Sequence, residues 1–320
     1  MSSKPTILLT NAIHPDGEAI LLPHAKLLVA LDTKPETLRA QAADVAGIIV
    51  RAKLPDDIVD HAPKLKGMVR HGVGLDFIPV KAATARGVAV ANLPGSNTQA
   101  VAEYCMSALL HLRRPLARMD GLMRREGWAP ARAVAEQLSE LGGTNLGILG
   151  VGTIGRRIAK IAHDGFGMKV LGTSRTKGAL PSFVEEVSLE DLFEKSDAVV
   201  VSCALTDETR GIVSAAMIAR MPRHSVLVNV SRGAVVDTAA IIAALNSNKI
   251  GGAALDVFDV QPLPADSPLF GCPNLLLTPH TAGITASSSR TMSVGAAEEM
   301  VRILKGERPL NLINPDYQSN

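Results

Sequence analysis

The feature that most constrains the fold of this chain is a glycine-rich turn between an apolar run and a helical pattern. Residues 146–149 are apolar, the next six read Gly150-Val-Gly-Thr-Ile-Gly155, and isoleucines then recur at helical spacing. In such a turn the first glycine permits the sharp bend, the second lets a pyrophosphate approach, and the third lets helix and strand pack closely. Free N–H groups at the helix N-terminus favour phosphate charge. A purely structural turn is the alternative, but the flanking strand and helix favour a dinucleotide site formed by Gly150, Gly152, Thr153, Ile154 and Gly155.

The rest of the chain alternates short apolar runs with amphipathic segments, the order typical of a parallel sheet covered by helices on both faces. A chain of 320 residues is long enough for two domains of about 100–200 residues each. We expect an α/β fold with strands at 6–10, 26–31, 47–51, 67–71, 88–91, 146–149, 169–173, 198–202, 225–229, 252–255 and 274–277. Helices are expected at 35–43, 55–61, 79–86, 153–162, 189–194, 215–220, 238–246 and 287–305.

The segment Leu93-Pro-Gly-Ser-Asn97 predicts a break in the chain, because proline and glycine end regular structure. One long helix is expected after it, from Thr98 to about Arg125, with an apolar side formed by residues such as Val101 and Cys105. The segment that follows this helix, as far as Leu141, is predicted to be a loop.

The composition argues against several classes of function. A net charge of +2 gives no electrostatic reason to expect binding to nucleic acid or to a membrane surface. Cys105, Cys203 and Cys272 lack the spacing of a metal site and are typical of reduced thiols. The N-terminal apolar run is too short for a signal peptide, and no stretch approaches the roughly 18 apolar residues of a membrane span. We therefore expect a soluble, cytoplasmic protein without a metal site.

The segment Ser174-Arg-Thr-Lys177 bears on the choice of dinucleotide. It ends the strand after the glycine-turn helix, where NAD-specific sites usually carry an acidic residue that binds the ribose 2′-hydroxyl. A carboxylate there would repel a 2′-phosphate, whereas guanidinium binds phosphate through two hydrogen bonds. Ser174, Arg175 and Lys177 therefore favour NADP, and a site that accepts NAD as well stays open.

Two more candidate residues are expected near the carboxyl ends of later strands. Arg232 follows the strand at 225–229, where an arginine can bind a carboxylate and polarise an adjacent carbonyl. His280 lies between Pro279 and a turn of small residues, and histidine gives and takes protons near neutral pH. Taken alone, the first could be a surface arginine and the second a structural histidine.

Taken together, these segments resemble the D-isomer-specific 2-hydroxyacid dehydrogenase family over nearly the whole chain. The resemblance is carried, in order, by 147–155, 228–237, 254–258 and 277–280. Ser174 with Arg175 resembles the NADPH-using glyoxylate/hydroxypyruvate reductase branch. The family implies two doubly wound parallel-sheet domains, a Rossmann cofactor domain (98–285) and a discontinuous flavodoxin-like substrate domain (1–97 plus 286–320). It also implies a homodimer formed through the cofactor domain and the helix near 98–125.

The resemblance further implies hydride transfer between NAD(P)H and a small 2-ketoacid, with glyoxylate or hydroxypyruvate as the expected substrate. The backbone N–H groups of Val73 and Gly74, together with Arg232, would bind the substrate carboxylate. His280 would protonate the carbonyl oxygen, and Arg51 would face the substrate cleft. In the same comparison Val230 and Asp256 fall among the cofactor-binding positions.

One departure from the family pattern concerns the partner of the histidine. In the family, a glutamate precedes the proline that follows an Asp-Val-Phe sequence. In this chain that sequence is Asp256-Val-Phe258, and Gln261 stands before Pro262 in place of the glutamate. A glutamate stabilises imidazolium and raises the pKa of the histidine, and glutamine can keep the hydrogen bond but supplies no charge. The hypothesis is that His280 has a lower pKa than in relatives, so that reduction fades at a lower pH. Asp259 is a less favoured substitute for the missing carboxylate.

Gln261 keeps two other functions open. A glutamine here also resembles the NAD-dependent formate dehydrogenases, whose reaction needs no proton relay, although their longer chain and asparagine motif are not evident in this sequence. The other alternative is a dinucleotide-sensing binding protein without catalysis. Further departures are Phe77, at the expected substrate pocket, and Ser202 and Ala204, at the expected cofactor wall.

Overall fold

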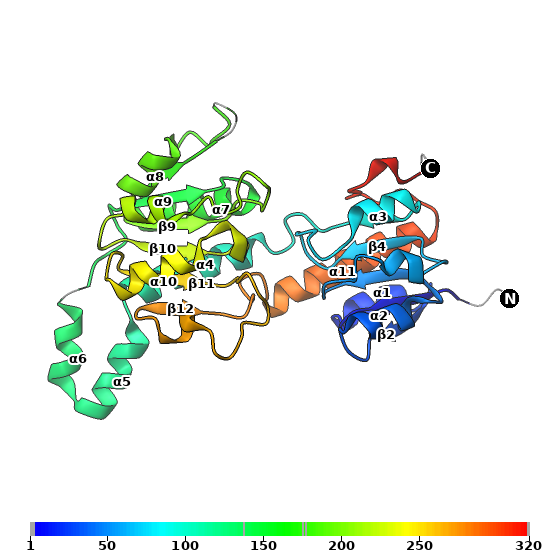
Figure 1. The fold of residues 1–320 in the computed structure, drawn as a ribbon, viewed down its shortest axis with the longest axis horizontal. Helices are drawn as coiled ribbons and strands as arrows, with labels where there is room; N and C mark the ends of the chain where they lie inside the picture. The colour runs from blue at the N-terminus through cyan, green and yellow to red at the C-terminus, as the bar shows by residue number, and fades with distance from the viewer. Residues whose placement is uncertain (1–3, 137, 175, 177, 319–320) are drawn as a thin grey trace. The chain divides into compact units, whose positions relative to one another are not determined.

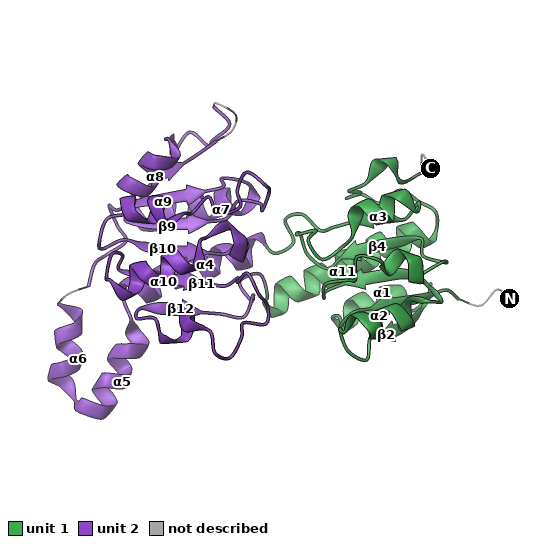
Figure 2. Cartoon of the chain, in the orientation of Figure 1, with its two compact units in different colours: residues 1–97, 284–320 green, residues 98–283 purple. Residues whose placement is uncertain are grey.

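The computed structural model describes residues 4–136, 138–174, 176 and 178–318, and the chain divides into two compact units. Unit 1 comprises residues 1–97 and 284–320, and unit 2 comprises residues 98–283 (Figure 2). Among the described helices, none combines the length and apolar character that a membrane span requires. Each unit is an α/β domain built on one parallel sheet (Figure 1).

The sheet of unit 1 has five parallel strands in the order β2-β1-β3-β4-β5. Its strands are β1 (Thr6–Leu9), β2 (Lys26–Val29), β3 (Val45–Val50), β4 (Gly67–Arg70) and β5 (Ala89–Ala91). One face is covered by α2 (Pro35–Ala42), the 3-10 turn η1 (Ile58–His61) and α3 (Val80–Ala85), and the other by α1 (Pro15–Leu21) and α11 (Ala286–Leu304). This is the flavodoxin-like strand order, so the predicted fold of this unit is confirmed.

The sheet of unit 2 has seven parallel strands in the order β12-β11-β10-β9-β6-β7-β8. Its strands are β6 (Asn145–Leu149), β7 (Lys169–Gly172), β8 (Val184–Glu186), β9 (Ala198–Val201), β10 (Val226–Asn229), β11 (Gly252–Leu255) and β12 (Leu275–Leu277). One face is covered by α4 (Thr98–Arg113) and α7 (Thr153–Phe166), and the other by α8 (Leu189–Lys195), α9 (Ala215–Arg220) and α10 (Thr238–Asn246). The order is that of a Rossmann fold with one added strand, which confirms the second fold prediction.

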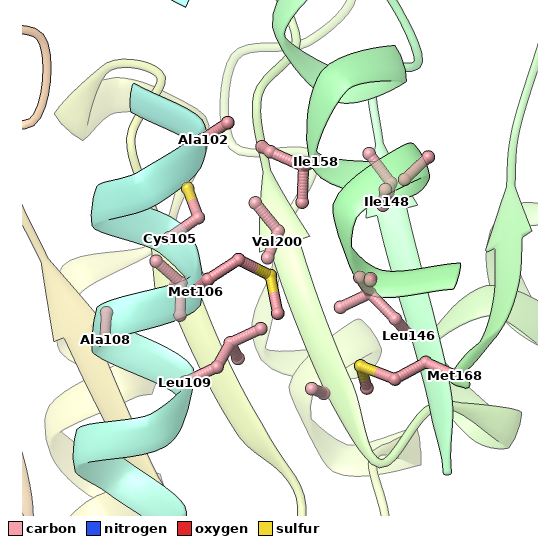
Figure 3. Close-up of a cluster of buried hydrophobic side chains, with 14 of the residues drawn as sticks. Ala102, Cys105, Met106, Ala108, Leu109, Leu146, Ile148, Ile158, Met168 and Val200 are labelled. Carbon is pink, nitrogen blue, oxygen red and sulfur yellow. The ribbon is translucent and has the colours of Figure 1, made fainter. Parts of the chain in front are cut away.

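The core of unit 2 follows the alternation of side chains along its strands. Ile148 and Val200 face α4 and α7, whereas Leu149 and Val201 face the opposite layer of helices. Figure 3 shows the first of these cores, in which side chains of α4 point toward those of the sheet and of α7. Packing on both faces holds the central strands in register.

The register of this sheet brings the ends of five strands level with one another. The last residues of β6, β9, β10, β11 and β12 pair across the sheet as Leu149, Val201, Asn229, Leu255 and Leu277. The segments that follow these residues therefore begin along one edge, which is where open α/β sheets bind their ligands.

Three predicted elements are wrong. The helix expected over 98–125 is interrupted at Pro115 and becomes α4 and α5 (Leu116–Glu126), because proline has no N–H and disfavours helical geometry in the residue before it. The segment after it, predicted to be a loop, contains α6 (Trp128–Ala135), which packs on α5. The helix expected at 55–61 is only the short turn η1, since Pro55 starts a segment that closes by 3-10 bonds.

Several short elements lie outside the sequence predictions. They are α1, β8 and the 3-10 turns η2 (Gly233–Val235), η3 (Pro268–Gly271) and η4 (Pro315–Gln318). Of these, η2 matters for function because it directly follows Arg232.

Candidate active site

The glycine turn joins β6 to α7, and two of its glycines are required by close backbone contacts. Gly150 has a φ of +101°, and a Cβ on it would lie 2.4 Å from the backbone nitrogen of Cys203. A Cβ on Gly155 would lie 2.2 Å from the carbonyl oxygen of Gly150. A Cβ on Gly152 would meet no atom within 4 Å, so the backbone is open to a ligand at that position.

The first turn of α7 offers backbone N–H groups to an anion. Gly152 caps the helix with φ −82° and ψ −156°, and the first turn carries no acidic residue. Within the described part of the chain, the N–H groups of Thr153 and Ile154 donate to no protein acceptor. The helix dipole adds to these donors. The turn therefore fits the pyrophosphate of a dinucleotide.

Ser174 closes a local turn just after β7. Its Oγ donates to the carbonyl oxygen of Thr176 at 2.6 Å and accepts the Thr176 N–H at 3.1 Å. Arg175 and Lys177, the other residues expected at a 2′-phosphate, lie outside the described residues. The predicted cofactor loop is thus described only in part.

Two charged residues that sequence reasoning missed contact the same loop. The Arg156 guanidinium, on α7, donates to the carbonyl oxygen of Ala179. The Glu186 carboxylate, at the end of β8, accepts the N–H of Gly178 at 3.2 Å. Their charges have opposite effects on a nearby phosphate. The position of Arg156 directly after the glycine motif was a signal in the sequence, whereas Glu186 lies on a strand that was not predicted.

Arg232 lies in a turn that polar contacts fix just beyond β10. The side chain of Asn229 is nearly fully buried, donates through Nδ2 to the carbonyl oxygen of Arg232 at 3.0 Å, and accepts the Ser231 N–H at 3.0 Å. The Ser231 hydroxyl donates to the carbonyl oxygen of Cys203, in the segment after β9. The Arg232 side chain is half-buried, and its Nη1 donates to the carbonyl oxygen of Ser231 at 2.7 Å.

The Arg232 turn packs against the segment that leads to Gln261. A Cβ on Gly233 would lie 2.1 Å from the carbonyl carbon of Phe258, so the two backbones are in direct contact. In this segment the Asp259 carboxylate accepts a hydrogen bond from the Thr238 hydroxyl at 2.9 Å. The partner of Asp259 in this bond is thus Thr238, whereas His280 Nδ1 bonds to Gln261.

His280 is paired with Gln261, as expected of the residue that replaces the family glutamate. His280 Nδ1 lies 2.9 Å from Oε1 of Gln261, and Gln261 Nε2 donates to the carbonyl oxygen of Phe258 at 3.2 Å. Because Oε1 can only accept, Nδ1 carries the proton in this bond. The glutamine therefore sets the orientation and tautomer of the imidazole without adding a negative charge.

The backbone around His280 is held by Asp256. His280 has a left-handed φ of +57°, and its N–H donates to the backbone oxygen of Asp256 at 2.8 Å. The Asp256 carboxylate is 1% exposed and accepts from the Thr278 hydroxyl, the Thr281 N–H and the Ala282 N–H at 2.6, 2.8 and 2.9 Å. Such a set of bonds can over-determine a strained residue. Thr278 was not among the predicted site residues.

In unit 1, Val73 and Gly74 form a loop after β4. The Val73 carbonyl oxygen accepts from Asn92 Nδ2 at 2.7 Å, and the Gly74 carbonyl oxygen accepts from Arg70 Nε at 3.1 Å. The Arg70 guanidinium also stacks on the ring of Phe77 at 4.5 Å. In the described residues the N–H groups of Val73 and Gly74 meet no protein acceptor. Two adjacent donors are therefore available to an anion.

Arg51 and His71 follow neighbouring strands of the same sheet. The Arg51 N–H donates to Thr10 Oγ1 at 2.8 Å, and its guanidinium donates to the carbonyl oxygen of Ala12. His71 is 5% exposed, and its Nε2 bonds to Ser293 Oγ at 2.8 Å. Burial, helped by the positive charge of Arg51, lowers the pKa of His71 to about 4. His71 is therefore neutral near pH 7.

The structure brings most of the predicted cofactor and catalytic residues to one edge of the sheet in unit 2. The glycine turn, Val230, the Arg232 turn, Asp256 and His280 all follow strand ends that lie level in the sheet. Arg51, Val73 and Gly74 lie beyond the carboxyl ends of strands in unit 1. An anion-binding turn, an arginine and an oriented histidine on a Rossmann sheet define a dinucleotide-dependent oxidoreductase.

Comparison with known proteins agrees with this class. Residues 106–282 match the family model described as D-isomer specific 2-hydroxyacid dehydrogenase, NAD binding domain. The glyoxylate reductase of Aeropyrum pernix is 35% identical over 331 residues, which cover 97% of this chain and 96% of the relative.

Two solved structures are similar over almost the whole chain. The NADPH-dependent glyoxylate/hydroxypyruvate reductase of Sinorhizobium meliloti, solved with NADP and malonate, has a TM-score of 0.86 at 30% identity, covering 99% of this chain and 98% of that one. The NAD-dependent formate dehydrogenase of Staphylococcus aureus, solved with NAD, has a TM-score of 0.85 at 27% identity, covering 96% and 98%.

The chain belongs to the D-isomer-specific 2-hydroxyacid dehydrogenase family. It is an NAD(P)-dependent oxidoreductase that acts on CH–OH groups and transfers hydride between a nicotinamide cofactor and a 2-ketoacid. The family resemblance and the enzyme class predicted from the sequence are thus confirmed.

Proposed function

We propose that the protein reduces glyoxylate or hydroxypyruvate to the corresponding 2-hydroxyacid and prefers NADPH to NADH. The observation that carries the proposal is the His280–Gln261 pair at 2.9 Å, on the sheet edge that also bears the Arg232 turn and the glycine turn. The names of the Aeropyrum pernix and Sinorhizobium meliloti relatives support the same substrates.

The cofactor site proposed for residues 98–285 uses the groups that the fold leaves open to an anion. The backbone of Gly150, Gly152, Thr153, Ile154 and Gly155 binds the pyrophosphate, and Val230 and Asp256 belong to the wall of the same site. The nicotinamide of the bound cofactor supplies the hydride that reduces the 2-keto carbon. The substrate domain consists of 1–97 plus 286–320.

In unit 2, Arg232 is the group proposed to bind the substrate carboxylate. In unit 1, the N–H groups of Val73 and Gly74 and the guanidinium of Arg51 are the groups proposed to bind an anion. Arg232 also polarises the 2-keto oxygen as negative charge develops on it. His280 gives its Nε2 proton to that oxygen during reduction and takes the proton back in the reverse direction. Gln261 holds the Nδ1 proton, so Nε2 is the nitrogen that exchanges one.

A panel of 2-ketoacids tests the reaction with matched arginine variants. Arg232→Ala should lower kcat/KM by about 10²- to 10³-fold, because it removes a group that stabilises transition-state charge, and Arg232→Lys should recover only part of the loss. Arg223→Ala is the control, since Arg223 is an exposed residue that bonds to Asn248. Near-normal turnover of Arg232→Ala on every accepted 2-ketoacid would overturn the proposal.

The preference for NADPH, for which Ser174, Arg175 and Lys177 are the proposed residues, is tested at Arg175 and Glu186. Arg175→Ala should raise the KM for NADPH by about tenfold or more, because a charged hydrogen bond to the 2′-phosphate is lost, and should leave the KM for NADH unchanged. Glu186→Gln should improve NADPH binding by removing a carboxylate that contacts the same loop at Gly178. Equal KM values for both cofactors in the wild type would contradict the preference.

Formate oxidation is a second candidate, because Gln261 rather than a carboxylate contacts His280. The two reactions separate in one assay. NADH formation from formate, without reduction of any 2-ketoacid, would favour the formate dehydrogenase reaction.

We further propose a cytoplasmic homodimer assembled through unit 2. Helix α5 has no buried residue, and Leu116, Met123 and Trp128 on the α5–α6 hairpin are 63%, 43% and 68% exposed. An apolar surface of this kind is typical of a protein interface. The thiols of Cys105, Cys203 and Cys272 are unbridged, as in a reducing compartment.

A further inference from the structure

A chain of hydrogen bonds runs from helix α4 to the turn that carries His280. The Tyr104 hydroxyl lies 2.7 Å from Thr278 Oγ1, and Thr278 Oγ1 lies 2.6 Å from the Asp256 carboxylate. A carboxylate can only accept a hydrogen bond, so the Thr278 hydroxyl donates its single hydrogen to Asp256. Thr278 Oγ1 must therefore accept the hydrogen bond from the Tyr104 hydroxyl. Burial raises the pKa of Tyr104 to about 12, so the phenol keeps this proton near neutral pH.

The end of this chain fixes the backbone on both sides of the histidine. Asp256 Oδ1 accepts from Thr278 and from the Thr281 N–H, and Oδ2 accepts from the Ala282 N–H. His280, which lies between Thr278 and Thr281, has a φ of +57°, a value that residues other than glycine rarely adopt. Relaxation of this turn would rotate the imidazole away from its bond with Gln261.

The other end of the chain is anchored in the core of unit 2. Tyr104 packs against the cluster formed by α4, α7 and the central strands. Asp256 follows β11 and Thr278 follows β12, so the three residues connect a helix to two strand ends. A side-chain network on rigid elements is suited to holding a catalytic group in place.

We propose that Tyr104 and Thr278 are positioning residues, which act through Asp256 to align His280 for proton transfer. This inference rests on the proposed role of His280 as proton donor. In this proposal the buried Asp256 carboxylate orients the turn that carries His280, in addition to its proposed place at the cofactor wall.

The test uses variants that remove single hydroxyl groups. Tyr104→Phe keeps the packed ring and should lower kcat about fivefold, the effect of one lost hydrogen bond. Thr278→Val should lower kcat more, and Thr278→Ser, which keeps the hydroxyl, should restore it. The Kd for NADPH should stay at its wild-type value in Tyr104→Phe, and the Tm should fall by no more than the few degrees that one lost hydrogen bond explains. Tyr317→Phe, at the only other tyrosine and in unit 1, is the matched control.

Hydrogen exchange provides a readout that does not depend on turnover. The amides of Thr281 and Ala282 should exchange faster in Thr278→Val than in the wild type, because the Asp256 carboxylate loses a partner that orients it. The same change, smaller in size, is expected in Tyr104→Phe.

His280→Gln separates this inference from the proposed function. Near-normal turnover of His280→Gln would overturn both the role of His280 and its positioning. If His280→Gln abolishes turnover while Tyr104→Phe and Thr278→Val keep wild-type kcat and exchange rates, the positioning role alone is wrong. Parallel losses of kcat, NADPH affinity and Tm would also overturn it, since they mark a general structural role.

Discussion

Gln261 shows how a single amide can preserve a geometry while changing its electrostatics. Its Oε1 accepts from His280 Nδ1, and its Nε2 is tied to the carbonyl oxygen of Phe258, so the amide has one orientation. A glutamate could make the first bond and would add a negative charge beside the imidazole. The difference between the two residues therefore concerns the stability of the imidazolium, and it is measurable through pH.

Gln261→Glu should extend reduction to higher pH. The added carboxylate favours the protonated imidazole and raises the pKa of His280. Because reduction consumes the protonated form, activity should persist to a correspondingly higher pH. The measurement is the pH profile of kcat/KM for 2-ketoacid reduction, with Asp259→Asn as control. Superimposable profiles for the wild type and Gln261→Glu would show that the hypothesis is wrong.

His71 should make the stability of unit 1 depend on pH. Its folded-state pKa of about 4 lies below the ordinary value of 6.5, so the unfolded chain binds more protons between these values. The stabilisation is complete above pH 6.5 and is lost as the pH falls toward 4, amounting to about 3 kcal/mol. Urea unfolding at about pH 7 and about pH 5 should show a smaller fall for His71→Gln than for the wild type. The exposed His24→Gln is the control, and equal falls in all three proteins would contradict the assignment.

Site residues that lie in a short sequence motif could be predicted from the sequence. Site residues defined by contacts between distant segments could not. The glycines, Arg232 and His280 lie in segments whose local sequence indicates a turn after a strand. Tyr104 and Thr278 are 174 positions apart, and nothing local to either residue indicates their bond. Their contact exists only because α4 packs against β11, the strand that pairs with β12.

At the scale of elements, the strongest local signals gave the most accurate predictions. Helices α9 and α10 and strand β11 have the predicted bounds, since a capping residue or a continuous apolar run marks each of them. Strand β8 was missed because two of its three residues are exposed, which leaves no apolar run to detect. Helix α6 was missed because its proline, in the first turn, resembles a loop signal.

Replacement of a glycine by alanine in the glycine turn should have different effects at Gly155 and at Gly152. Gly155→Ala should lower the Tm, because its Cβ would lie 2.2 Å from the backbone oxygen of Gly150 and α7 would have to move. Gly152→Ala should leave the Tm unchanged, since its φ of −82° suits alanine and no atom lies within 4 Å, but should weaken NADPH binding by filling the approach to the backbone.

Thermal unfolding and NADPH titration distinguish these outcomes. An unchanged NADPH affinity in Gly152→Ala would mean that the pyrophosphate does not approach that position. A Tm in Gly155→Ala equal to that of the wild type would mean that the turn can relax.

At the scale of the whole molecule, the exposed apolar residues of the α5–α6 hairpin are not accounted for by packing within one chain. The two helices contact each other, and in Figure 1 they form a hairpin outside the layers of unit 2. Their exposed apolar residues would be shielded in a dimer, which would also protect Trp128, the only tryptophan of the protein.

Trp128 should therefore report on assembly. Its emission should move to longer wavelength on dilution, and sedimentation should show the dimer dissociating over the same concentrations. Leu116→Glu should raise the dimer dissociation constant about tenfold or more, because it places a charge in an apolar interface. Leu31→Glu, at an exposed leucine of unit 1, is the matched control. A monomer at every concentration, or identical behaviour of the two variants, would exclude this interface.

The discontinuous course of unit 1 has a consequence for biosynthesis. Its sheet is complete after β5, yet α11 covers part of one face, and Leu312 pairs with Ala91 of β5. On the ribosome, residues 98–283 emerge before α11 is translated. Unit 2 can therefore fold while unit 1 still exposes an apolar sheet, and the nascent chain offers that face to chaperones from the completion of β5 until α11 appears, an interval of about 10–40 s at about 5–20 residues per second.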